Sequence, residues 1–267
     1  MNKEYPLVSV VMAEYNTNEN VLKESIKSII TQTYENIEFI IINDGSKTNL
    51  EKIVDHFKDD RIKIINNKVN KGLPYSLNKG IEEANGKYIA RMDSDDISFP
   101  NRIKKQVEFL ESHPKYTVLG AKAIEFDENG EIGVLGKSGK ICNTDLYNGN
   151  TPIHPTVLMK RSEVNKIKYN ENYRRSQDLA LWFEMLVQNE RIYVMDEVLL
   201  YYRVHSIDYK KRRLKHRKYE IKARWEYYSK LDISFMHCMY TILKSIIAGL
   251  LPGKLIGYIR KKIVLKK

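Results

Sequence analysis

Three carboxylates stand within four residues in the segment Asp93-Ser94-Asp95-Asp96. Carboxylates this close repel one another, so the segment costs stability unless a cation or hydrogen-bond donors compensate. A hard divalent cation held by one or two carboxylates and by phosphate oxygens is the usual solution. The alternative is an acidic cap on a helix that starts near Pro100. Because the segment follows a buried, strand-like run, we favour a metal site.

A second cluster, Asn43-Asp44-Gly45-Ser46, also ends an apolar run. Asp-Gly and Gly-Ser are common turn dipeptides, so taken alone this segment favours a simple turn. The functional alternative is that Asp44 accepts hydrogen bonds from the edge of a nucleobase. Tyr15, at the end of the first apolar run, would then stack on that base, since an aromatic face stacks on any base.

A further carboxylate, Asp178, stands at the start of a helical pattern in the segment Ser176–Trp182. It could be an ordinary acidic residue favoured by the helix dipole. It could also be a general base that takes the proton of an attacking hydroxyl. The helix N-terminal amides predict that this carboxylate is ionised at neutral pH.

The elements that position these residues follow from the apolar pattern. Helical patterns follow Asn18 and cover 50–57, 73–84 and 100–112, and they alternate with strand-like runs at Val8–Met12, Phe39–Ile42, Ile62–Ile65 and Tyr88–Met92. This alternation predicts a parallel sheet with helices on both faces. Ligands of such sheets bind at the carboxyl ends of the strands, where Tyr15, Asp44 and Asp93 stand.

The second half of the chain is less regular. We expect a strand over 117–126, a hairpin turn at Asn129-Gly130 into 132–135, an irregular stretch to Asn150, a helix over 179–188 and a strand over 198–204. The pattern favours one α/β domain over residues 1–230, with a nucleotide-binding half (1–112) and an acceptor half (113–230), followed by a tail over 231–267.

Several segments together resemble the large, inverting family 2 of glycosyltransferases, in the right order over about residues 6–205. They are Val8–Asn16, Ile30–Tyr34, Ile41–Ser46, Asn70–Gly72, Leu77–Gly80, Gly86–Ile89, Asp93–Asp96 and Gln177-Asp178. The resemblance implies a GT-A fold, a nucleotide-sugar donor that is commonly a UDP-sugar, and Mn²⁺ or Mg²⁺ as cofactor. It also implies direct displacement with inversion at the anomeric carbon and a saccharide acceptor for a bacterial surface polysaccharide, carried on a lipid.

The family's site residues carry over to matching positions. The resemblance implies nucleotide binding by Ala13, Tyr15, Asp44, Gly72, Asp93 and Ser94, metal binding by Asp95, Asp96 and His205, and a catalytic base at Asp178. It further implies contacts with acceptor or diphosphate by His154, Gln177 and Arg203. A lone histidine is more often a packing or surface residue than a ligand. Ala13 and Gln177 depart from the family, which often has Pro or Thr at the first position and an acid at the second.

Charge and cysteine content limit the partners. The net charge of +11 is concentrated in residues 203–267, which hold 18 Lys/Arg against 4 Asp/Glu, so the body is near neutral and a general nucleic-acid partner is disfavoured. Apolar residues at helical spacing in the tail (243, 246, 247, 250 and 251) predict a basic amphipathic segment on the inner face of the membrane. Packing on the domain or in a homodimer is the alternative. Two cysteines in a chain of this length indicate the cytoplasm.

Two rival functions need consideration. A sugar-nucleotidyltransferase, whose fold is related, would have a Gly-rich, basic phosphate loop after the first strand, where this chain has Glu14-Tyr15-Asn16. A binding module that has lost catalysis would not need to retain both Asp95 and Asp178. The sequence therefore favours a metal-dependent glycosyltransferase.

Overall fold

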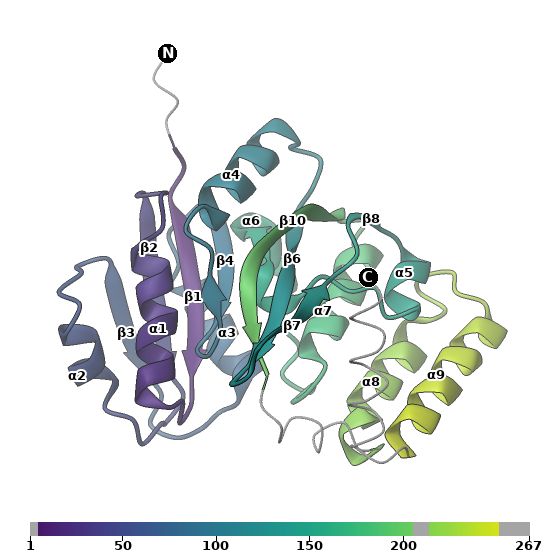
Figure 1. Cartoon of the computed structure of the whole chain (residues 1–267). Coiled ribbons are helices and arrows are strands. Elements are labelled where there is room, and N and C mark those ends of the chain that lie inside the picture. The colour runs from purple at the N-terminus through teal and green to yellow at the C-terminus, as the bar shows by residue number, and fades with distance from the viewer. Residues whose placement is uncertain (1–4, 205–213, 251–267) are drawn as a thin grey trace.

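The computed structural model describes residues 5–204 and 214–250 (Figure 1). Four parallel strands form its first half in the order β3-β2-β1-β4: β1 Val8–Glu14, β2 Ile37–Asn43, β3 Ile62–Asn66 and β4 Tyr88–Asp93. They alternate with α1 (Glu19–Ile30), α2 (Leu50–Asp55) and α3 (Leu73–Glu82). Asn18 caps α1 by accepting from the amides of Asn20 and Val21. The predicted parallel unit is thus confirmed.

The second half extends this sheet with mixed pairing. β9 (Leu158–Lys160) lies antiparallel between β4 and β6 (Val118–Asp127), and β10 (Ile192–Arg203) runs parallel to β6. Three shorter strands complete the sheet: β5 Ile97–Ser98, β7 Gly130–Leu135 and β8 Gly139–Ile141. The predicted hairpin at Asn129-Gly130 is the β6–β7 turn. The stretch predicted as irregular contains β8 and α5 (Asn143–Tyr147), which are too short to leave a periodic pattern.

Helices cover both faces of the sheet, as predicted. α1, α2 and α4 (Arg102–Ser112) pack in one apolar cluster, and α1 is seen in front of the sheet in Figure 1. α3, α6 (Arg161–Ile167) and α7 (Gln177–Val187) belong to a second cluster on the opposite face. Trp182 on α7 is fully buried there and anchors the helix that carries Asp178. Burying an aromatic side chain of this size stabilises the fold by roughly 2–3 kcal/mol.

Two further helices stand at the edge of the molecule beyond α7. α8 (Leu214–Tyr227) packs on α7, and α9 (Phe235–Leu250) packs on α8 (Figure 1). The Tyr147 hydroxyl donates to the Arg224 carbonyl over 2.6 Å and ties α5 to α8. No helix in residues 5–204 and 214–250 is long and apolar enough to span a bilayer. Residues 251–267 of the predicted tail lie outside the described residues.

Candidate active site

The sheet register brings the predicted polar segments to one edge. Ala13 near the end of β1 pairs with Asp93 at the end of β4, and the neighbouring Glu14 pairs with Asn43 at the end of β2. The loops that follow these three strands therefore leave the sheet side by side. Tyr15, Asp44 and the acidic segment 93–96 lie in or beside those loops, where parallel sheets bind ligands.

Asp44 organises the loop that leads into α3. Its carboxylate is buried and accepts the Asn67 side-chain amide at 2.9 Å and the backbone amides of Lys71 and Gly72, both at 2.8 Å. Gly72 has a φ of +93°, which favours glycine at this turn. A carboxylate offers about four acceptor positions, so these three bonds leave about one for a ligand.

Glu14 holds the first two loops together. Its Oε1 accepts from the Thr17 amide at 2.9 Å and from the Ser46 hydroxyl at 3.1 Å. Its Oε2 is buried without a hydrogen-bond partner in the part of the chain that the structure describes, and burial raises the pKa of this carboxyl. Between these anchored residues the Tyr15 side chain is 52% exposed, so its ring is open to a base.

The acidic segment forms a compact group of oxygen ligands. Asp93, Asp95 and Asp96 each place one carboxylate oxygen within 4.8 Å of the others, while the Ser94 hydroxyl lies 2.7 Å from that of Thr17. Asp96 is almost fully buried, and burial together with the charges of Asp93 and Asp95 raises its pKa well above the usual range. Its Oδ2 has no hydrogen-bond partner among the described residues. Crowded oxygens with an unsatisfied buried atom fit a hard cation such as Mg²⁺ or Mn²⁺.

Arg203 fixes this segment from β10. Its backbone amide donates to Asp96 Oδ1, and its guanidinium Nε donates to the Asp95 carbonyl, both at 2.8 Å. The same guanidinium pairs with Glu24 at 2.6 Å and lies 4.5 Å from the ring centroid of Phe126. Arg203 therefore lies at the acidic segment, with its donors directed to the protein. His205 lies outside the described residues.

Arg91 is a buried cation at the centre of the site that the sequence interpretation missed. It lies two residues before Asp93 on β4 and pairs with that carboxylate. Its Nε and Nη1 have no partner within residues 5–204 and 214–250. Its charge acts to lower the pKa of Asp96, His154, Tyr169 and Asp178, so it is coupled electrostatically to all four groups. An arginine inside the apolar run Tyr88–Met92 was the signal that could have identified it.

Asp178 lies in the first turn of α7, next to Gln177, the first residue of that helix. Its side chain is half-buried. Burial raises the pKa of the carboxyl, while the backbone amide of Leu179 and the charge of Arg91 act to lower it. The loss of solvation therefore outweighs the helix amides in shifting this pKa, and the ionisation of Asp178 at neutral pH stays a prediction. A carboxylate with a raised pKa is a stronger base than an ordinary aspartate.

His154 belongs to the same cluster. It begins the short helix η1 (His154–Thr156) before β9, and its Nε2 lies 2.7 Å from the Tyr169 hydroxyl. Burial and the charge of Arg91 hold the pKa of His154 well below the ordinary histidine value. Its ring also lies edge-on to that of Trp182, with centroids 6.0 Å apart. His154 is therefore a neutral, buried hydrogen-bonding group, and Tyr169 is a second residue that sequence reasoning missed.

Comparisons with known proteins identify the family of this chain. The model of the family described as "Glycosyl transferase family 2" matches residues 9–174. An uncharacterised glycosyltransferase of Methanocaldococcus jannaschii is 36% identical over 83% of this chain and 80% of its own. The UDP-Gal:alpha-D-GlcNAc-diphosphoundecaprenol beta-1,3-galactosyltransferase of Escherichia coli is 30% identical over 99% of this chain and 98% of its own.

Solved structures confirm the predicted fold class. The mannosyltransferase PcManGT of Pyrobaculum calidifontis, in complex with GDP-Man and Mn²⁺, superposes with a TM-score of 0.66 at 14% identity, over 98% of this chain and 81% of that one. This chain therefore has the GT-A fold, and with the matches in sequence it belongs to glycosyltransferase family 2.

Proposed function

We propose that the protein transfers a sugar, with inversion, from a UDP-sugar to a saccharide acceptor that is linked to a lipid diphosphate. The observation that carries this proposal is the half-buried Asp178 with its raised pKa, in one electrostatic cluster with Arg91 and the carboxylates 93–96. The Escherichia coli relative, named for UDP-Gal and a diphosphoundecaprenol acceptor, supports the same donor and acceptor classes. Such products serve bacterial surface polysaccharides.

The donor nucleotide would lie over the ends of β1, β2 and β4. Tyr15 supplies an exposed ring for stacking, and Asp44 keeps one acceptor position for a base N–H. Ala13 and Gly72 border this space with little side-chain bulk. Asp93 and Ser94, at the end of β4, are the nearest polar groups for the ribose.

The diphosphate would lie beside the acidic segment. Asp95 and Asp96, with His205, are the proposed ligands of Mn²⁺ or Mg²⁺. When bound, such an ion neutralises charge on the leaving diphosphate. Arg203 holds the segment in place through its bonds to Asp95 and Asp96. Arg91 adds a buried positive charge on the same side.

Asp178 is the proposed base. An acceptor hydroxyl placed against its carboxylate would lose its proton to Asp178 as the oxygen attacks the anomeric carbon from the face opposite the diphosphate. Gln177 and the neutral His154 are the proposed hydrogen-bonding partners of the acceptor. Because His154 is uncharged, it does not compete with Arg91 for the Asp178 carboxylate.

A lipid-linked acceptor would place the protein at the inner face of the bacterial membrane as a peripheral protein. A homodimer stays a prediction. The residues that choose the sugar and the acceptor hydroxyl would come from the acceptor half, around η1 and α7.

The test combines donor binding with product analysis. Thermal unfolding with UDP, GDP and dTDP is measured with Mn²⁺ and with EDTA, for the wild type and for Asp95→Asn. We expect UDP to stabilise the wild type against thermal unfolding only when Mn²⁺ is present. Asp95→Asn should lose both this stabilisation and the transfer activity. NMR of the product anomer reports inversion. Equal stabilisation with and without EDTA contradicts the metal assignment, and metal-dependent UDP binding without transfer or donor hydrolysis favours a binding module.

A further inference from the structure

Helix α9 has two opposite sides. The side toward α8 is buried through Cys238, Thr241, Ile242, Ser245 and Gly249. The opposite side is apolar and exposed, and we call it the α9 apolar face: Met236, Met239, Tyr240, Leu243, Ile247 and Leu250. Steps of three and four residues place these side chains in one stripe. Three of the tail residues that the sequence pattern assigned to an amphipathic helix therefore point away from the domain: Leu243, Ile247 and Leu250.

The stripe is too continuous for an ordinary protein surface. Single exposed apolar side chains are normal, but contiguous apolar patches mark interaction sites. Met236 and Leu250, near the two ends of the helix, are 76% and 68% exposed. No Asp or Glu occurs in α9, so nothing in the helix opposes an apolar or anionic partner.

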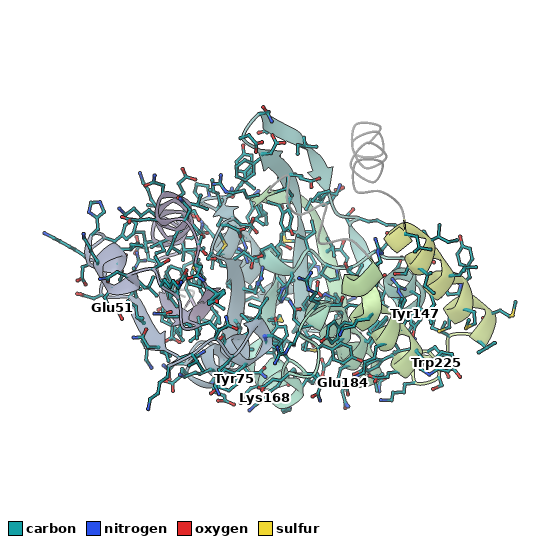
Figure 2. The ribbon with its side chains drawn as sticks, turned by 90° about the horizontal axis from the view of Figure 1, so that it is seen from below. Glu51, Tyr75, Tyr147, Lys168, Glu184 and Trp225 are labelled. Carbon is teal, nitrogen blue, oxygen red and sulfur yellow. The ribbon has the colours of Figure 1, made fainter. Side chains whose placement is uncertain are left out.

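An aromatic cluster borders the start of this face. The Trp225 ring on α8 lies 5.3 Å from that of Tyr228 and 6.3 Å from that of Phe235 at the start of α9. Trp225 and Phe235 are both about half exposed. Figure 2 shows Trp225 at the end of the molecule opposite Glu51, away from the nucleotide-binding half. Tryptophan and tyrosine with one apolar and one wet side are typical of the membrane–water boundary.

Cations lie along the flank of the same helix. A cavity of about 260 Å³ between α5, α8 and α9 is lined by Arg217, Arg224 and Lys244. Arg217 and Arg224 both pair with Glu220, and Arg224 is buried, so the exposed Lys244 is the cation that this flank presents to a partner. Tyr240 lines this cavity too, so the cations adjoin the α9 apolar face. The sequence after Leu250 adds six Lys/Arg and no Asp/Glu in residues 251–267. Basic residues beside an apolar stripe favour anionic lipid surfaces.

We propose that the α9 apolar face and its cationic flank dock on an anionic lipid bilayer. This inference rests on the proposed lipid-linked acceptor, because it assigns the surface that brings the domain to its substrate. A second copy is a poorer occupant. Symmetric pairing centred on this face would bring the exposed Lys244 of both copies together, and like charges repel.

The experiment uses the full chain and vesicles of phosphatidylcholine, with or without phosphatidylglycerol. Flotation should show binding to the mixed vesicles and much weaker binding to phosphatidylcholine alone. Leu243→Asp and Ile247→Asp should each lower the partition coefficient by about tenfold or more, since each replaces a buried apolar contact by a charge. Val134→Asp, the same change at an exposed site on β7, is the matched control and should bind as wild type.

Fluorescence gives a second readout, because Trp225 and the buried Trp182 are the two tryptophans of the chain. Mixed vesicles should shift the emission to the blue in the wild type and not in Trp225→Phe. Unchanged vesicle binding by both Asp variants, or equal binding to both lipids, overturns the proposal. If the wild type forms a dimer without lipid and Leu243→Asp is monomeric, the α9 apolar face binds a second copy and the lipid proposal is overturned.

Donor binding separates this proposal from the proposed function. Leu243→Asp should keep the metal-dependent stabilisation by UDP, because the change lies on α9. A variant with normal UDP binding and no vesicle binding supports the docking surface. If Leu243→Asp loses both UDP binding and vesicle binding, the variant has unfolded. The test then passes to Lys244→Glu, which changes the charge of an exposed residue. This variant must bind the mixed vesicles less tightly than wild type, or the proposal fails.

Discussion

The proposed nucleotide side and the proposed acceptor side of the site hold their carboxylates in opposite ways. On the nucleotide side, Asp44 accepts two backbone amides and a side-chain amide, so its charge is used to shape the loop into α3. On the acceptor side, Asp178 lies half-buried beside Arg91 and its pKa is raised. The first arrangement suits recognition, because it fixes geometry. The second suits catalysis, because it keeps a carboxylate basic.

The largest test of this contrast is Asp178→Asn. The change keeps the shape of the side chain and removes its basicity, so transfer should fall by about 10²–10⁴. Calorimetry should show nearly unchanged binding of UDP with Mn²⁺. The exposed Asp196→Asn is the control, with full activity expected. If Asp178→Asn retains transfer within a few-fold of wild type at saturating acceptor, the base lies elsewhere.

Asp44→Ala should produce the next largest effect, and on the other side. Loss of its hydrogen bonds should weaken UDP binding by about 1.5–3 kcal/mol, or roughly 10- to 150-fold. Because Asp44 also holds the amides of Lys71 and Gly72, the melting temperature should fall as well. Asp60→Ala, an exposed carboxylate, controls for the loss of charge. Equal UDP binding by Asp44→Ala and wild type, measured by calorimetry, contradicts the assignment.

The nucleotide side was predictable because its chemistry is local in sequence. Each of Tyr15, Asp44 and Asp93 follows or ends an apolar run, and parallel strands bring those ends to one edge. On the acceptor side, the family resemblance named Asp178 and His154, but local sequence did not predict which residues meet there. Arg91, His154 and Tyr169 come from β4, η1 and the segment after α6, and they meet only through packing across antiparallel strands.

The fold shows the same division. The regular alternation of the first 112 residues predicted the four parallel strands β1 to β4, whereas β5, β8 and β9 have two or three residues each and carry no readable period. The tail shows a further limit. Its apolar spacing indicated a helix, but whether Leu243 faces protein or solvent depends on α8, which lacks a clear apolar pattern in sequence.

The pH dependence of transfer gives a smaller and more graded test. A raised pKa at Asp178 means that its base form is lost as pH falls through a value above that of an ordinary aspartate. At saturating acceptor, kcat should therefore fall about tenfold per pH unit below that pKa. His154 should not add an inflection to the pH profile of kcat near the ordinary histidine pKa, because burial lowers the pKa of His154. The acid limb should persist in His154→Gln and disappear in Asp178→Asn, and a limb that moves with His154 contradicts this division.

Glu14→Gln should produce the smallest effect. It tests whether burial also disfavours the charged form of a carboxyl on the nucleotide side. Burial raises the pKa of Glu14, so the folded state binds its proton more tightly than the unfolded chain does. The stability that this proton contributes is full below the unfolded pKa and is lost as pH rises through the folded pKa. Glutamine keeps an oxygen for the Thr17 amide and the Ser46 hydroxyl and carries no charge.

At pH 5 the free energy of unfolding of Glu14→Gln should therefore lie within about 1 kcal/mol of wild type. Toward pH 8 the variant should become the more stable of the two, as followed by urea unfolding across this range. If the wild type instead becomes more stable than Glu14→Gln as pH rises, then the loops around Glu14 stabilise its ionised form. The two sides of the site would in that case differ less than the structure indicates.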